Sequence, residues 1–271
     1  MRRLLAFASV VSIFATSPAY AVDTTASTDA TALATSLQGP GVTFTSASLS
    51  SNGPEVGFFN NGASALGINS GIVLTTGGLG CVGSSNTSTQ CTGGSGTASS
   101  LALGFTATST DLFFNYVFAS EEYNEFVNQG FNDTFSLLLN GPGFSNANLA
   151  VLPGGGGVVS IDNVNNGSNS AFYRDNTVLG LPIQYDGLTT VLTAQALGLT
   201  IGSNYTLTFG ITDNGDTVLD SAVFIQGGSV GIVTPPTGGV PEPGTWAMML
   251  LGFGAIGLAM QRRRASVTAF A

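Results

Sequence analysis

The chain has no lysine and no histidine, and charged residues make up only 8% of its 271 residues. Without histidine, Ser-His-Asp catalysis and His-rich zinc sites are excluded. Arginine supplies all the positive charge, and between residues 22 and 240 only Arg174 stands against fourteen acidic residues. So acidic a chain lacks the basic surface that nucleic-acid binding requires. We therefore expect no nucleic-acid partner.

Long helical patterns rich in Glu and Lys are also missing, whereas Gly, Ser, Thr and Asn are abundant. This composition favours many short strands joined by turns. In the stretches 112–118, 135–139 and 205–211, apolar residues recur at every second position, which is the period of a strand with one buried face. Further strands are expected at 42–45, 71–77, 158–161, 188–194 and 222–225, and a short helix within 22–37. The sequence therefore predicts an all-β fold, an antiparallel, jelly-roll-like β-sandwich over residues 22–233.

The connections that follow two of these strands are acidic. Glutamates come directly after the strand that ends at Ser120, and three aspartates follow the strand at 205–211. Crowded carboxylates need a counter-charge, and one arginine cannot serve them all. A hard cation such as Ca²⁺ takes about 6–8 oxygen ligands and suits such a site, so we predict Ca²⁺ as a cofactor. The candidate metal ligands are Glu121, Glu122, Asp133, Asp213, Asp216 and Asp220.

Two structural alternatives remain open for these acids. Each aspartate could instead cap backbone N–H groups in a turn. Ser120 could cap a short helix with Glu121 and Glu122 in its first turn, where the helix dipole favours them by roughly 0.3–1 kcal/mol each. The ligand spacing is not that of an EF-hand. The scarcity of positive charge favours the metal.

Residues 1–21 have the three parts of a secretory signal peptide. Two arginines form the positive start, residues 4–15 form an apolar run, and Ala19 and Ala21 make a small-x-small cleavage site. A retained membrane anchor is the alternative, but the apolar run is short for a span. We therefore expect the domain that follows to be exported.

Cys81 and Cys91 are the only cysteines, and they lie in a loop rich in Gly, Ser, Thr and Asn. In an exported chain, such a pair most simply forms one local disulfide, which stabilises by roughly 2–3 kcal/mol in the chain-entropy model. A redox or metal role is the alternative, but neither a CxxC spacing nor a histidine supports it. We predict the disulfide.

The end of the chain is predicted to enter a membrane. Residues 234–243 form a Pro/Gly linker, and the next seventeen residues, 244–260, carry no charge. As a helix they would be about 25 Å long, just enough to span a bilayer. The basic tail, 261–271, should then stay in the cytoplasm with the domain outside. The arginine cluster argues against the alternative of a buried core helix.

The tail, VPEPGTW…GAIGLAMQRRR, resembles the PEP-CTERM sorting signal, with a Pro-Glu-Pro motif, an apolar span and an arginine cluster. The resemblance implies that an exosortase-type sorting enzyme of a Gram-negative, exopolysaccharide-producing bacterium recognises the tail and removes it near the motif. It also implies a precursor tethered in the inner membrane, which then reaches the cell surface or extracellular matrix. The sorting-motif residues are Pro241, Glu242, Pro243, Arg262, Arg263 and Arg264.

The body resembles the choice-of-anchor L domain of such exported proteins. The matching pieces, in order, are SGIVLTTG, YVFASEEYNEFV, FNDTFSLLLNGPG, YDGLTTVLTA and ITDNGDTVLDSAVFI. They cover roughly residues 30–230. The resemblance implies location and architecture rather than a reaction.

Two function classes follow from these observations. The first is a non-catalytic surface or matrix protein that contacts exopolysaccharide. Aromatic residues that could stack on sugars, with core packing as the alternative, are Tyr123, Phe126, Tyr173 and Tyr185. The second is a secreted glycoside hydrolase, which needs two carboxylates either about 5–5.5 Å or about 6.5–9.5 Å apart. Its candidate acids are Glu121, Glu122, Glu125 and Asp133. We favour the first class.

Overall fold

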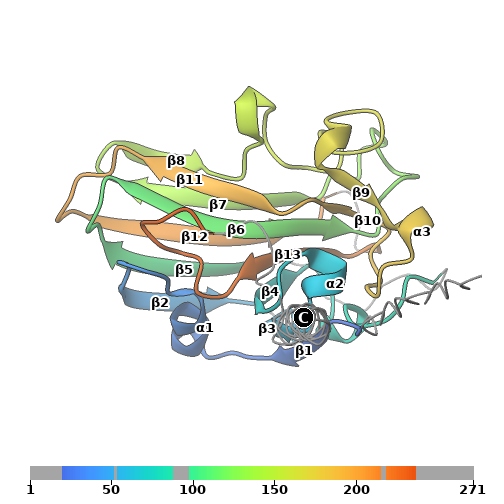
Figure 1. Ribbon diagram of the computed structural model, residues 1–271, viewed down its shortest axis with the longest axis horizontal. Coiled ribbons are helices and arrows are strands. Elements are labelled where there is room, and N and C mark those ends of the chain that lie inside the picture. The colour runs from blue at the N-terminus through green and yellow to red at the C-terminus, as the bar shows by residue number, and fades with distance from the viewer. Residues whose placement is uncertain (1–19, 52–53, 88–97, 215–217, 236–271) are drawn as a thin grey trace, which may run out of the picture.

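The computed structural model describes residues 20–51, 54–87, 98–214 and 218–235, which form two antiparallel sheets packed face to face (Figure 1). One sheet holds, in order, β1 (Asp23–Ala26), β3 (Val56–Asn60), β4 (Gly71–Thr75), β13 (Ser221–Gln226), β6 (Asp111–Ser120), β10 (Gly187–Thr189) and β9 (Tyr173–Asp175), with β11 (Leu192–Leu197) paired to the first half of β6. The other sheet holds, in order, β2 (Phe44–Ser50), β5 (Ser99–Thr106), β12 (Asn204–Thr212), β7 (Thr134–Gly141) and β8 (Phe144–Asn148).

Eight of these strands have the connectivity of a jelly roll. Four lie side by side in the order β4-β13-β6-β11, and four face them in the order β5-β12-β7-β8. Each connection between consecutive strands of these eight crosses from one sheet to the other, except the hairpin from β7 to β8. This is a double-sheet jelly roll built from Greek keys, as the alternating pattern predicted.

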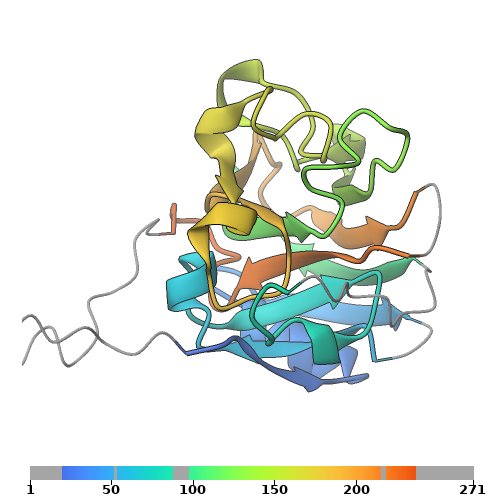
Figure 2. The same cartoon turned by 90° about the vertical axis from the view of Figure 1, so that its right-hand side faces the viewer.

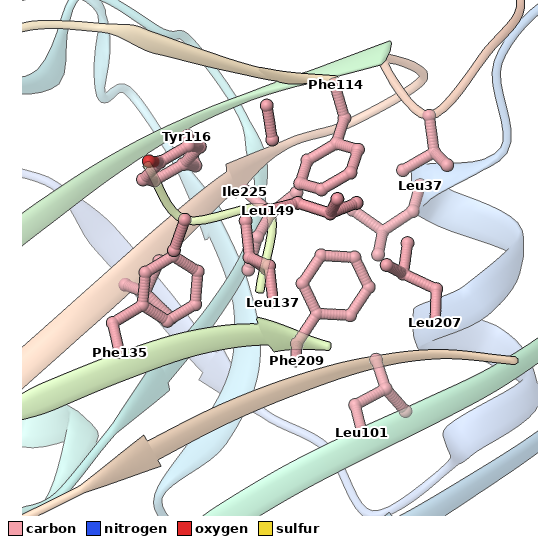
Figure 3. Packing of buried hydrophobic residues seen from close by; sticks show 14 of the residues in the cluster. Leu37, Leu101, Phe114, Tyr116, Phe135, Leu137, Leu149, Leu207, Phe209 and Ile225 are labelled. Carbon is pink, nitrogen blue, oxygen red and sulfur yellow. The ribbon is translucent and has the colours of Figure 1, made fainter. Parts of the chain in front are cut away.

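The main core lies between the two sheets. The inward residues of β12 are Tyr205, Leu207, Phe209 and Ile211, and each is at most 3% exposed. Phe209 meets Phe114 of β6 with ring centroids 5.5 Å apart, and Figure 3 shows both rings among buried leucines. The period of two in the sequence therefore identified the buried face correctly.

A second apolar cluster covers the outer face of the first sheet. Val117 of β6 and Phe224 of β13 point away from the main core and pack with Tyr185 and Leu188. Phe224 also contacts the ring of Phe59 edge-on, with centroids 5.3 Å apart. The second half of β6 is consequently buried on both faces, which explains why its apolar residues do not alternate strictly.

Several strand predictions need correction. Residues 158–161 do not form a strand. They make two isolated bridges to different segments, Val151–Val158 and Thr134–Ser160, and do not run alongside a single neighbouring strand. The strand predicted at 188–194 is two strands, β10 and β11, interrupted where Thr190 N–H donates to Phe172 O at 2.8 Å. The strand predicted at 42–45 begins at Phe44 and runs to Ser50. The strands β1, β3, β5, β8 and β9 were missed.

The helices are short. The helix predicted within 22–37 is α1 (Ala30–Leu37), whose first N–H groups donate to the Asp29 carboxylate. The others are α2 (Ala63–Leu66), α3 (Asn176–Leu179) and the single turns η1 (Leu79–Cys81), η2 (Pro153–Gly155) and η3 (Ser170–Phe172). In the described part of the chain, no helix has the length and apolarity to cross a membrane. The predicted span at 244–260 lies outside that part.

Candidate functional site

The four long connections of the jelly roll meet at one end of the sandwich, which we call the loop end. They join β4 to β5, β6 to β7, β8 to β11 through β9 and β10, and β12 to β13. Their strand termini lie side by side, because Ser120 pairs with Ser221 and Thr134 pairs with Thr212. The other three connections of the jelly roll, β5 to β6, β7 to β8 and β11 to β12, are short and lie at the opposite end. Figure 2 views the molecule from the loop end.

The two acidic connections are in direct contact. Glu121 N–H donates to Asp220 O at 3.1 Å, so the start of one connection lies against the end of the other. Asn214 donates its N–H to Asp133 Oδ1 at 2.9 Å and its side-chain amide to Asn132 O at 3.0 Å. The two connections that supply the candidate ligands therefore lie together.

The carboxylates at this junction are buried. Glu121, Glu122, Asp133 and Asp220 are between 0 and 2% exposed. Asp213 is partly exposed, and Asp216 lies outside the described residues. The chain has no lysine or histidine to set against these acids. Burial of so much negative charge requires compensation, since an isolated carboxylate loses its hydration on burial.

The hydrogen bonds at the junction bear on both structural alternatives for the acids. Asp133 accepts the backbone N–H of Asn214, which belongs to the other connection, so this bond joins the two connections and is not a cap within one turn. Ser120 Oγ accepts from Glu122 N–H at 2.9 Å, as a helix cap would. The helix itself is absent, because residues 121–130 form turns that contain one α-turn bond, from Phe126 N–H to Glu122 O. Of the two structural alternatives, the capped helix is therefore not what residues 121–130 form.

The metal site stays a prediction. Among residues 20–51, 54–87, 98–214 and 218–235, no three acidic, cysteine or histidine side chains are arranged to hold a metal ion. Asp216, one of the six candidate ligands, is not among these residues.

Arg174, on β9, donates to Ala65 O, and burial lowers the pKa of its guanidinium.

Three of the four candidate sugar-stacking aromatics are buried. Tyr123 and Tyr185 are fully buried, and Tyr173 is 8% exposed with its ring 4.8 Å from that of Tyr123. Burial raises the pKa of all three phenols. Core packing is therefore their role. Phe126 stays partly exposed and meets Phe131 edge-on at 5.3 Å, a partner that the sequence did not suggest.

A polar network next to these aromatics was also missed. Asp175 Oδ2 accepts from the side-chain amides of Asn124 and Asn166, at 3.1 and 2.9 Å. Burial acts to raise the pKa of Asp175, but these bonds and those from Thr177 outweigh it, so the pKa is lowered. Burial raises the pKa of Asp186. The hydrogen bond from Asn86 lowers this pKa, but the charges of Glu125 and Asp175 raise it further, so the net shift is upward. No sequence spacing signals this network, since its members come from the β4–β5, β6–β7 and β8–β11 connections.

The family model of the choice-of-anchor L domain matches residues 21–231. The chain belongs to this family. A second model, that of the PEP-CTERM protein-sorting motif, matches residues 239–264. Neither the curated proteins nor the solved structures contained a match. The two family matches confirm the resemblances drawn from the sequence, and the sorting motif marks an exported protein that an exosortase recognises.

The choice-of-anchor L fold does not present the predicted carboxylate pair of a glycoside hydrolase. Glu121, Glu122 and Asp133 are buried, and of the four candidate acids only Glu125 is exposed. A glycosidase needs both of its carboxylates in contact with the substrate. The burial of three of the four argues against this carboxylate pair.

Several predicted residues of this choice-of-anchor L protein lie outside the described residues. Cys91 is one, so its disulfide with Cys81 stays a prediction. The cleavage-site residue Ala19 and the whole sorting tail, from Pro241 to Arg264, are others. Ala21, the second cleavage-site residue, is described and directly precedes the buried Val22.

Proposed function

We propose that this choice-of-anchor L protein is a non-catalytic module of the cell surface or extracellular matrix whose loop end holds Ca²⁺ and contacts exopolysaccharide. Before processing, its precursor is anchored in the inner membrane of a Gram-negative bacterium by the helix at 244–260. The observation that carries the proposal is the burial of four carboxylates where the two acidic connections touch.

Calcium suits this junction for reasons of charge and ligand type. Arg174 is the one cationic side chain between residues 22 and 240, and it is engaged with Ala65 O. Ca²⁺ prefers oxygen ligands and neutralises two carboxylates at once. The proposed ligands come from both connections, so the ion would link the β6–β7 connection to the β12–β13 connection. This link would hold the loop end in one conformation.

Exopolysaccharide suits the surface beside this junction. The side-chain amides of Asn124 and Asn166 can donate to and accept from sugar hydroxyls, and the Phe126 ring offers an apolar face for stacking. Phe131 holds the Phe126 ring edge-on. Amides fixed by hydrogen bonds to Asp175 lose little side-chain entropy on binding.

Replacing Phe126 by alanine should weaken binding to exopolysaccharide by about fivefold or more, because about 1 kcal/mol of apolar contact is lost. Co-sedimentation of the protein with purified exopolysaccharide measures this. The control is Ile201→Ala, which truncates a 62% exposed side chain at the opposite end of the sandwich. Equal binding by both variants would remove Phe126 from the contact surface. No binding by the unmodified protein would remove the glycan contact, and glycan cleavage would overturn the non-catalytic assignment.

A further inference from the structure

A small polar pocket lies at the loop end, between the β4–β5 connection and the segment that contains α3, which Figure 2 shows in gold. Its volume is about 290 Å³, near the lower limit of the roughly 300–1,000 Å³ that ligand pockets have. Most residues that line it have hydroxyl, amide or carboxylate side chains, namely Ser85, Asn86, Thr87, Asn176, Thr177 and Asp186. A pocket of this size and lining suits one hydroxyl-rich unit, such as a single sugar ring.

Hydrogen bonds hold the two walls of this pocket against each other. Ser84 Oγ donates to Gln184 Oε1 at 2.8 Å, and Asn86 Nδ2 donates to Asp186 Oδ1 at 2.7 Å. Gln184 Nε2 also donates to Thr87 O at 3.1 Å. The β4–β5 connection is thereby fixed to the residues that precede β10. A pocket whose walls are fixed before binding loses little conformational entropy when a ligand enters.

The pocket continues the polar surface to which exopolysaccharide is assigned above. Asp175 Oδ2 accepts from Asn124 and Asn166 on that surface. Asp175 Oδ1 accepts from Thr177 Oγ, at the pocket wall, at 2.5 Å. One carboxylate therefore orders both the surface and the wall. A glycan chain that lies on the surface can place one of its units in the pocket.

One wall of the pocket carries a carboxylate that is only half paired. Asp186 Oδ1 accepts from Asn86, whereas Asp186 Oδ2 has no hydrogen-bond partner among the described residues. Burial raises the pKa of Asp186, and the charges of Glu125 and Asp175 raise it further. Arg174, the one cationic side chain of the described chain, is not among the groups that shift this pKa. A cationic ligand would supply the missing counter-charge.

We propose that this pocket binds one amino-sugar unit of an exopolysaccharide and pairs its protonated amine with Asp186 Oδ2. The inference rests on the glycan contact proposed above. A polysaccharide with carboxylate or sulfate groups would be repelled, because fourteen acids stand against one arginine between residues 22 and 240. A neutral sugar would leave the half-buried charge of Asp186 unpaired, which is costly. The hydroxyl and amide side chains of the pocket suit the ring hydroxyls.

A bare metal ion fits this pocket less well. Asp186 is the one acid among the described residues that line it, whereas Ca²⁺ takes about 6–8 oxygen ligands. In the part of the chain that the structure describes, no three acidic, cysteine or histidine side chains are arranged to hold an ion. An amine needs one carboxylate and a few neutral acceptors, and the pocket offers both.

The test titrates the full chain, in mild detergent, with two disaccharides that differ only at their amines. The chitosan disaccharide has free amines, and the chitin disaccharide has the same rings with both amines acetylated. Calorimetry should show that the free-amine disaccharide binds about tenfold more tightly or better, as expected for one charge-assisted hydrogen bond. Asp186→Asn should remove this preference. Asp111→Asn, which removes the same charge at the opposite end of β6, should keep it.

A second variant, Ser85→Trp, fills the pocket from an exposed position and leaves every acid in place. It should weaken binding of the free-amine disaccharide by a similar factor without lowering the melting temperature. Equal binding of the two disaccharides, binding of neither, or a preference that survives Asp186→Asn would overturn the proposal. Co-sedimentation with purified exopolysaccharide separates this failure from failure of the proposed function. If the protein still co-sediments, the glycan contact stands and only the amino-sugar pocket is wrong.

Discussion

Replacing Phe209 by alanine should lower the free energy of unfolding by about 3–5 kcal/mol, the range for deleting a buried phenylalanine side chain. Phe209 is fully buried on β12, which lies between β5 and β7. Its ring contacts Phe114 of the facing sheet. The surrounding strands are paired on both sides and cannot close over the cavity. The melting temperature should therefore fall by roughly 6–20 °C in a domain of this size.

The matched control for this core substitution is Leu197→Ala. Leu197 is apolar and also lies on a strand, but it is 55% exposed. Its truncation should change the unfolding free energy by less than about 0.5 kcal/mol. A loss at Phe209 no larger than the loss at Leu197 would mean that the two sheets do not share a common core.

Replacing Gly77 by alanine should destabilise the protein by about 1–3 kcal/mol, the usual cost of overpacking. Gly77 follows β4 at the loop end, and a methyl group there would collide with the carboxylate of Asp220. Asp220 is 2% exposed, so its side chain cannot swing into solvent without disturbing the acidic junction. Urea unfolding measures the loss, with the midpoint falling while the slope stays constant.

The same loop supplies the control. Gly80→Ala places a methyl group where nothing lies within 4 Å, and Gly80 does not need a positive φ. This variant should be as stable as the unmodified protein or slightly more so, because alanine reduces the entropy of the unfolded chain. Equal stability of the two variants would show that Asp220 does not pack against Gly77.

Much of the fold could be predicted because one physical rule governs its central strands. In β7 and β12 a single face is buried, so apolar residues recur at every second position. The rule also applies to the missed strand β5, where Leu101, Leu103 and Phe105 are buried in alternation. The segment 158–161 was mispredicted because its valines and isoleucine are typical of a buried strand. In the structure it makes only isolated bridges to other segments.

The candidate site was predictable in position but not in detail. The positions of Glu121 and Asp220 next to strand ends implied that they meet, since crossing connections of a sandwich gather at its ends. Sequence alone could not show that Tyr123 and Tyr185 are buried, because the segments covering them are distant in the chain. The network around Asp175 joins asparagines from separate connections, and no local pattern encodes such contacts.

Calcium dependence of thermal melting tests the proposed loop end most directly. With Ca²⁺ at about 100-fold its Kd, binding should stabilise the native state by about 2.7 kcal/mol. The melting temperature should then be roughly 5–10 °C higher than in the presence of a chelator. Asp133→Asn should shrink this shift, whereas Asp111→Asn, at the opposite end of β6, should leave it unchanged. A shift with Ca²⁺ that Asp133→Asn reduces is the predicted result. Identical melting curves with Ca²⁺ and with chelator would contradict it.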